Sequence, residues 1–223
     1  MKRLPVINCC SDASGAWQAG LQQQVVVIVD VIDMSTTLEA ALEAGALKVY
    51  GAGPDSARGP VPVNPLAIGR KAGLEAKKMG ASVIIVAEPR WGSDEDRLNS
   101  CGKLLKGLHS AGIKNYQIVP NLGITTAKLV DFQYAVVIAV TNSGGVAFDA
   151  GWTAGGTVLT ATVARTWKMK GTQPARIGVD RALTLAMNLG KDISFVAASS
   201  NSQEDILAAQ YLAQLAMQRR GTC

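Results

Sequence analysis

Short apolar runs alternate with longer segments of helical periodicity along most of the chain. The runs VVVIV, from Val25, and VIIVA, from Val83, are wholly apolar and rich in β-branched residues, which is typical of strands buried on both faces. The pattern predicts strands over residues 3–8, 25–30, 48–50, 83–87, 116–119, 135–140, 157–163 and 193–197. It predicts helices over 36–45, 65–79, 94–110, 122–130, 145–153, 174–190 and 203–218. This alternation indicates a three-layer α/β/α fold around a largely parallel sheet.

Capping residues favour several of these helices. Thr36 or Ser35 is a suitable N-cap for the helix over 36–45, and Glu39 follows Thr36 by three residues, as in a capping box. Pro174 suits the first turn of its helix. Ser202 is a suitable N-cap for the last helix.

The chain also resembles itself at a constant offset of 110 residues. VVVIVD at 25–30 and AVVIAV at 135–140 are each followed by a polar loop, a helix that ends in Ala-Gly, and another strand. Segments 25–55 and 135–165 therefore form a pseudo-repeat. Two similar half-domains explain it about as well as ordinary βα alternation does, and residues 1–223 are expected to form one domain. The proline-rich segment 51–65 is expected to be an irregular loop with a functional or assembly role.

Composition and charge exclude several classes of protein. The chain is 48% hydrophobic and 17% charged, which excludes disorder, and no apolar run is long enough to span a bilayer. The net charge of +5 fits an acidic ligand, but the basic residues are scattered, so no nucleic-acid partner is expected. MKRLPVINCC lacks the apolar region of a signal peptide, so we expect a cytoplasmic protein. With only His109 and no CxxC spacing, neither a structural zinc site nor a histidine triad is expected.

Unusual polar residues follow four of the predicted strands. Asp30 and Asp33 end the first buried strand, and Glu88 and Arg90 follow VIIVA. The loops TNSGG from Thr141 and SSNSQED from Ser199 follow two later strands. Because ligands bind outside the carboxyl ends of parallel strands, these loops are expected to meet at one edge of the sheet. Asp30 needs a compensating partner there, since a buried carboxylate is costly to desolvate.

The residue types in these loops suit phosphate and magnesium. Hydroxyl and backbone N–H groups at helix N-termini can bind phosphate oxygens. Magnesium prefers carboxylate oxygens, and an arginine such as Arg90 can clamp an anion. The candidate phosphate-binding residues are Ser35, Thr36, Thr37, Thr141, Asn142, Ser143, Gly144 and Ser202, and the candidate metal ligands are Asp30, Glu88, Glu204 and Asp205. Each motif also has a structural explanation as a helix cap, a tight turn or an acid favoured by a helix dipole.

The run VVVIVDVIDMSTTLEAALEAGA from Val25 resembles the signature of the 2-phosphosulfolactate phosphatase family. The loop VTNSGG and the C-terminal SFVAASSNSQEDILAA resemble two further motifs of that family, in the same order, over residues 3–217. The resemblance implies an α/β phosphatase that uses Mg²⁺ to remove phosphate from 2-phospho-3-sulfolactate on the route to coenzyme M. It matches Asp30, Ser35, Thr36, Thr37, Thr141, Asn142, Gly144, Ser202, Glu204 and Asp205 to motif positions.

Two departures from the family pattern leave three hypotheses. Asp33 stands where the family has arginine, and Pro89 and Trp91 replace two glycines of another loop. We expect a magnesium-dependent phosphatase, a homo-oligomer, acting on a small anionic phosphorylated metabolite, with Asp30, Glu88 and Arg90 as catalytic residues. One alternative is a binding or structural protein that kept the fold without catalysis. The other is a different enzyme on the same scaffold, in which Asp33 binds a cationic group of the substrate.

Overall fold

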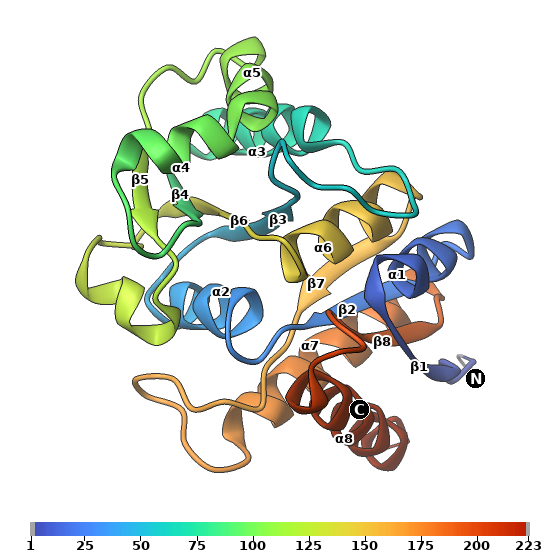
Figure 1. Ribbon diagram of the computed structural model, residues 1–223. Coiled ribbons are helices and arrows are strands. Elements are labelled where there is room, and N and C mark those ends of the chain that lie inside the picture. Colours follow the sequence, from blue (N-terminus) through green and yellow to red (C-terminus); the bar gives the residue numbers. More distant parts are fainter. Residues whose placement is uncertain (1–2, 222–223) are drawn as a thin grey trace.

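The computed structural model describes residues 3–221 and confirms the predicted α/β class (Figure 1). The strands are β1 (Ile7–Ser11), β2 (Val25–Val29), β3 (Lys48–Ala52), β4 (Ser82–Ala87), β5 (Gln117–Pro120), β6 (Ala135–Val140), β7 (Thr157–Thr160) and β8 (Ile193–Ala197). The helices are α1 (Asp12–Leu21), α2 (Met34–Glu43), α3 (Pro65–Met79), α4 (Asp94–Ser100), α5 (Gly102–Ser110), α6 (Gly144–Thr153), α7 (Gln173–Leu189) and α8 (Gln203–Arg219), with a 3₁₀ helix η1 (Gly123–Lys128).

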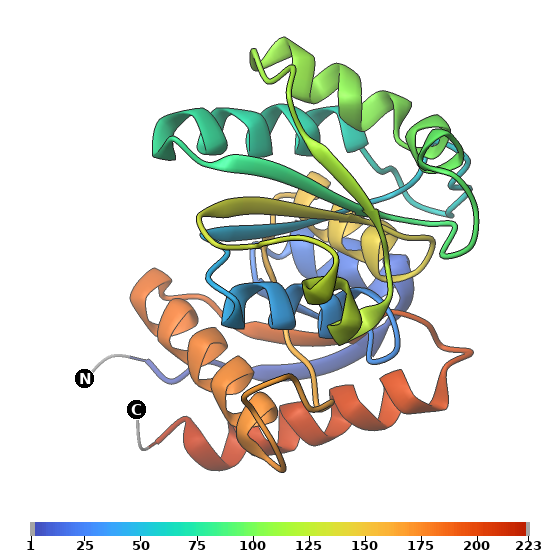
Figure 2. The same ribbon diagram turned by 90° about the vertical axis from the view of Figure 1, so that its left-hand side faces the viewer.

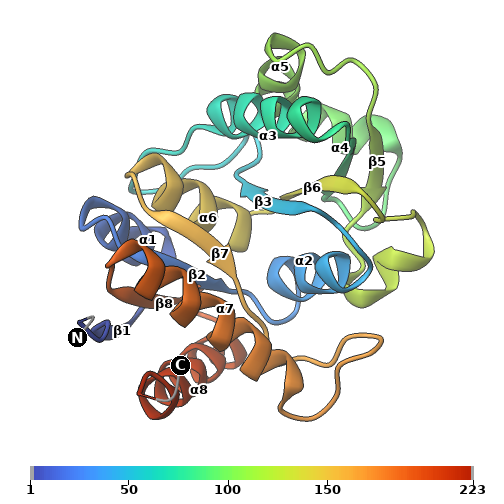
Figure 3. The same cartoon turned by 180° about the vertical axis from the view of Figure 1, so that it is seen from behind.

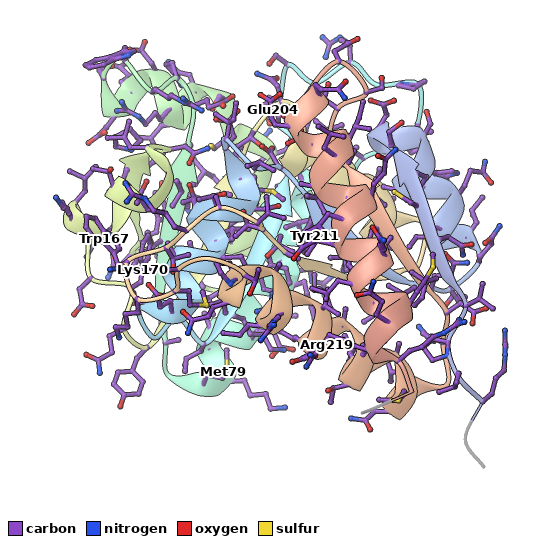
Figure 4. The ribbon with its side chains drawn as sticks, turned by 90° about the horizontal axis from the view of Figure 1, so that it is seen from below. Met79, Trp167, Lys170, Glu204, Tyr211 and Arg219 are labelled. Carbon is purple, nitrogen blue, oxygen red and sulfur yellow. The ribbon has the colours of Figure 1, made fainter. Side chains whose placement is uncertain are left out.

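The strands form two four-stranded parallel sheets rather than one. The first sheet has the order β1-β8-β2-β7 and the second the order β3-β6-β4-β5. Helices α1, α2 and α6 lie between the sheets, while α7 and α8 cover the outer face of the first and α3 and α5 that of the second (Figure 2). Figure 4 shows α8 along the lower face, from Glu204 to Arg219. Each half is thus an α/β/α sandwich, and the two share their inner helix layer.

The offset of 110 residues relates the two sheets. Val26 pairs with Val158 in the first sheet, and the residues at the equivalent positions, Val136 and Lys48, pair in the second. The segment β2-α2-β3 starts in the first sheet and ends in the second, whereas β6-α6-β7 crosses in the opposite direction. The sequence repeat therefore corresponds to two equivalent crossings between similar half-domains.

Several element predictions were wrong in detail. The helix α1 was missed, and the first strand begins at Ile7 rather than residue 3. The predicted helix over 94–110 is broken at Cys101 into α4 and α5, and the predicted helix over 122–130 is the shorter 3₁₀ turn η1. The irregular segment before α3, the first-turn position of Pro174 and the N-cap role of Ser202 are confirmed.

The predicted capping box of α2 was also wrong. This helix begins at Met34 after Asp33, so Ser35 and Thr36 lie inside its first turn. The Glu39 carboxylate does not reach back to the helix start, because it accepts hydrogen bonds from Thr160 and Arg181 instead. A buried partner across the helix layer therefore replaces the local cap.

Candidate active site

The four polar loops meet where the carboxyl ends of the two sheets face each other. Asp30 follows β2, and the segment 199–205 follows β8, both from the first sheet. Glu88 follows β4 and Thr141 follows β6, both from the second. The prediction that the loops meet at one edge of a single sheet was therefore wrong. They do meet, but each of the two sheets contributes two loops to a site between the half-domains.

Asp30 lies at the centre of this region and at the N-terminus of α6. Its side chain is buried, and only 2% of the residue is exposed. One carboxylate oxygen, Oδ2, accepts hydrogen bonds from Gly144 N at 3.0 Å and Ser143 Oγ at 3.3 Å, and Oδ1 accepts one from Asp33 N at 3.1 Å. Burial raises the pKa of Asp30, while these hydrogen bonds and the charge of Arg90 oppose the rise.

Gly144 makes this arrangement sterically feasible. A Cβ atom at position 144 would lie 2.3 Å from Asp30 Oδ2 and 2.8 Å from the Cβ of Met34. Any side chain would push the carboxylate away from the helix terminus. The Gly144 N–H that the sequence assigned to phosphate therefore binds Asp30 in this structure, and the next one, of Gly145, binds Thr141 Oγ1 at 2.8 Å.

The hydroxyls of Ser35, Thr36 and Thr37 are buried and bonded within the protein. Ser35 Oγ donates to Ile28 O and accepts from Asp30 N, and Thr37 Oγ1 donates to Asn121 Oδ1 at 2.6 Å. Thr36 Oγ1 bonds to Val31 O and to a second threonine hydroxyl. These groups fasten α2 to the end of β2, and their assignment to phosphate binding stays a prediction.

A pocket of about 630 Å³ opens on the side of the second sheet. Arg90 and Asp33 form an ion pair in its wall, and Trp91, 90% exposed, lies at the pocket as well. Glu88 accepts a hydrogen bond from Asn142 Nδ2 at 3.4 Å. Burial raises the pKa of Glu88, and the charge of Asp30 adds to the rise. The remaining lining residues are Pro54, Ser56, Pro89, Ser100 and Val140.

A smaller pocket of about 260 Å³ opens on the side of the first sheet, and Asp33 lines both pockets. Asp205 Oδ1 accepts a hydrogen bond from Val31 N at 2.8 Å, and Asp205 N donates to the N-cap Ser202 at 3.2 Å. Burial, reinforced by the charge of Asp30, raises the pKa of Asp205 to about 6. The other residues that line this pocket are Asp30, Ile32, Ser143, Ser199, Asn201, Ser202 and Glu204.

The candidate metal ligands do not form a preformed protein cage. Within residues 3–221, no group of three or more histidine, cysteine, aspartate or glutamate side chains is placed to hold a metal ion. Burial is the main cause of the raised pKa of both Glu88 and Asp205, and the negative charge of Asp30 adds to each rise, a repulsion that a divalent cation would relieve. Magnesium commonly uses one or two carboxylates together with water and substrate phosphate. The carboxylates therefore fit an ion shared with a phosphate better than an ion held by protein alone.

Sequence reasoning missed the partner of Asp33 and several lining residues. The Asp33–Arg90 pair joins loops from different sheets, so no local pattern could reveal it. Ser56 comes from the irregular segment before α3, and Ser100 from the end of α4. Only the expectation that the proline-rich loop is functional pointed to Ser56.

No helix among residues 3–221 is both long and apolar enough to cross a membrane. Comparison of the chain with protein-family models and with curated proteins finds no match. The assignment of a function therefore depends on the geometry and chemistry of the site itself.

Proposed function

We propose that the protein is a phosphomonoester hydrolase whose substrate is a small acidic phosphorylated metabolite such as 2-phosphosulfolactate. The observation that carries the proposal is the placement of buried Asp30 in the wall of one of the two polar pockets, beside Arg90, the half-buried Glu88 and the buried Asp205. Phosphoryl transfer depends mainly on positioning and on neutralising charge at the phosphate oxygens. This arrangement of one arginine with several carboxylates suits that task.

Each residue has a role in this proposal. Arg90 would exchange its ion pair with Asp33 for a bond to the anionic substrate. Glu88, with a raised pKa, would carry the proton needed by the leaving oxygen, and Asn142 would hold Glu88 in place. Asp30, fixed by Gly144, would orient a water molecule and accept its proton as the water oxygen bonds to phosphorus and the bond to the leaving oxygen breaks. Magnesium, when bound through carboxylates of this set, would supply additional positive charge to the phosphate.

Phosphate release from a panel of small phosphomonoesters, with magnesium or with chelator, tests the proposal. We expect chelator-sensitive release that falls by at least about a hundredfold in Asp30→Asn and in Glu88→Gln. Glu95→Gln is the matched control, because Glu95 is an exposed acid of α4 outside both pockets, and it should retain activity. Release that survives in Asp30→Asn would contradict the assignment of the site.

A second candidate is a protein that binds phosphorylated ligands without hydrolysing them. The internal bonding of the Ser35–Thr37 hydroxyls and the occupation of the α6 N-terminus by Asp30 favour it, because both leave fewer donors for a transition state. Calorimetric binding of a panel member, with no phosphate release from a folded protein, would select this candidate. If a substrate with a cationic group binds more weakly to Asp33→Asn than to wild type, the result would instead favour a different enzyme on the same scaffold.

We further propose that the protein acts in the cytoplasm as a homo-oligomer. Sedimentation of the full chain tests the assembly, and a single species of the monomer mass would contradict it.

A further inference from the structure

A third pocket lies between the half-domains, and it shares no lining residue with the two polar pockets. Its volume is about 620 Å³, within the range of small-molecule sites. It lies between β3 and β7, the edge strands of the two sheets, with α7 beside them, on the side seen in Figure 3. The lining residues are Leu42, Lys48, Val49, Tyr50, Val158, Leu159, Thr160, Arg181, Thr184, Leu185 and Asn188.

One cation in this pocket is held in a fixed position. Arg181 Nη2 donates to Glu39 Oε1 at 2.5 Å and to Thr160 O at 2.6 Å, and Thr160 Oγ1 donates to the same carboxylate oxygen at 2.7 Å. Glu39 lies behind the wall and is only 3% exposed, whereas the Arg181 side chain is 34% exposed. Among the described residues, Arg181 Nε and Nη1 have no hydrogen-bond partner, so they remain able to donate to a ligand.

Apart from Arg181, the lining consists of aliphatic side chains, Tyr50, the neutral polar residues Thr160, Thr184 and Asn188, and Lys48. Aliphatic side chains from α2, β3, β7 and α7 form its walls, and no acidic residue of the described chain lines it. Lys48 is the second cation, and its partner Glu75, at 3.0 Å, lies outside the lining. A pocket with apolar walls and a pre-positioned guanidinium favours a ligand with an apolar body and a carboxylate head, since the planar fork of arginine matches a carboxylate.

We infer that this pocket binds a small amphipathic carboxylate of the medium-chain fatty-acid type, independently of the polar site. Its head would lie against Arg181 and Lys48, and its chain between Val49, Leu159 and Leu185. Glu39 is the positioning residue for Arg181 and does not touch the ligand.

Titration calorimetry of the full chain with octanoate tests the inference, with 1-octanol and acetate as probes of tail and head alone. We expect one octanoate to bind per chain, and at least about tenfold weaker binding in Arg181→Gln, whereas 1-octanol should bind equally to both proteins. Leu185→Trp, which fills the pocket and leaves the Arg181–Glu39 pair intact, should abolish binding of octanoate and 1-octanol. Arg176→Gln, at an exposed position of α7 outside the lining, is the matched control and should bind like wild type.

Loss of Arg181 leaves Glu39 buried without its cation, so the double variant Glu39→Gln/Arg181→Gln should be measured as well, with folding checked by circular dichroism. It too should bind octanoate weakly. Failure of wild type to bind octanoate, or equal binding by wild type and Arg181→Gln, would overturn the inference. A dimer that dissociates in Leu185→Trp, together with no binding of octanoate, would show that the pocket is instead an interface between copies of the chain.

Discussion

The two crossings between the sheets have the same backbone plan but different chemistry. Asp30 follows β2 directly, whereas the position 110 residues later is the apolar Val140. Conversely, the first turn of α6 has Gly144, where α2 has Met34. One crossing therefore supplies the acid, and the other supplies the small residue and N–H group that receive it. Similar halves can thus form a site that neither could form alone.

A second pair of equivalent positions shows how the partner of a buried carboxylate matters. Glu39 in α2 and Asp149 in α6 are related by the same offset, and both side chains are buried. Glu39 is paired with the cation Arg181. The partners of Asp149 are neutral: Gly53 N at 3.3 Å, Asn64 N at 2.6 Å and Thr153 Oγ1 at 3.0 Å. Consistent with this, burial raises the pKa of Asp149 to about 6.

Removing these two carboxylates should produce the largest effect. Asp149→Ala leaves two backbone N–H groups and a hydroxyl without their acceptor, and we expect a loss of about 4 kcal/mol in unfolding free energy near pH 5. Glu39→Ala should cost about 2 kcal/mol, because Arg181 is partly exposed and can turn to water. Urea unfolding of both variants gives the ranking. A larger loss in Glu39→Ala would show that the ion pair, and not the backbone donors, dominates.

The next largest effect should be the dependence of the unfolding free energy on pH that Asp149 causes. Asp149 binds its proton more tightly when folded, with a pKa near 6 against 3.8, so it stabilises the fold at low pH. That contribution, about 3 kcal/mol at low pH, is lost as pH rises through about 4 to 6 and is absent near neutral pH. Other groups titrate in the same window, so the measurement is the difference in urea unfolding between wild type and Asp149→Asn. A difference that stays constant with pH would show that Asp149 titrates normally.

Gly144 tests the contact between the two crossings directly. Gly144→Ala places a methyl group on Asp30 Oδ2, and we expect a loss of about 2 kcal/mol from overpacking, measured by urea unfolding. Under the proposed function, phosphate release should fall as well. Gly59→Ala is the control, since the nearest atom to an added Cβ there is 3.7 Å away and its φ is not positive. Equal stability of the two variants would mean that Asp30 moves without cost.

The sequence predicted the α/β class and the positions of most strands along the chain, because buried β-branched runs have a clear local signature. It could not separate the strands into two sheets, since each βα unit has the same local pattern in either arrangement. Helix α1 was missed because its buried face consists of small residues, Ala13, Ala16, Ala19 and Gly20, with little periodic contrast. These allow close packing on α6, where a Cβ at Gly20 would lie 2.5 Å from Gly151 O.

The sequence likewise predicted only part of the candidate site. Asp30 was identified because a carboxylate at the end of an apolar strand requires a partner, and the structure provides that partner in Gly144. The bonding of the Ser35–Thr37 hydroxyls was not predictable, because helix capping and phosphate binding use the same residue types. The Asp33–Arg90 pair depends on how the two sheets are placed, which sequence spacing does not encode.

The smallest expected change in stability concerns that pair, and it bears most directly on function. Asp33→Asn removes one partner of a partly exposed ion pair, so the unfolding free energy should change by less than about 1 kcal/mol, and less still at high salt. Because Arg90 then lacks its internal anion, inorganic phosphate should bind several-fold more tightly, as measured by titration calorimetry. Asp94→Asn is the matched control, since Asp94 pairs with Arg97 outside both pockets. Weaker phosphate binding by Asp33→Asn would mean that Asp33 orients Arg90 for the ligand and does not compete with it. In that case Asp33 would hold an anion-binding side chain in place. Ser143, at the equivalent position of the other crossing, holds Asp30 in the same way, by a hydrogen bond.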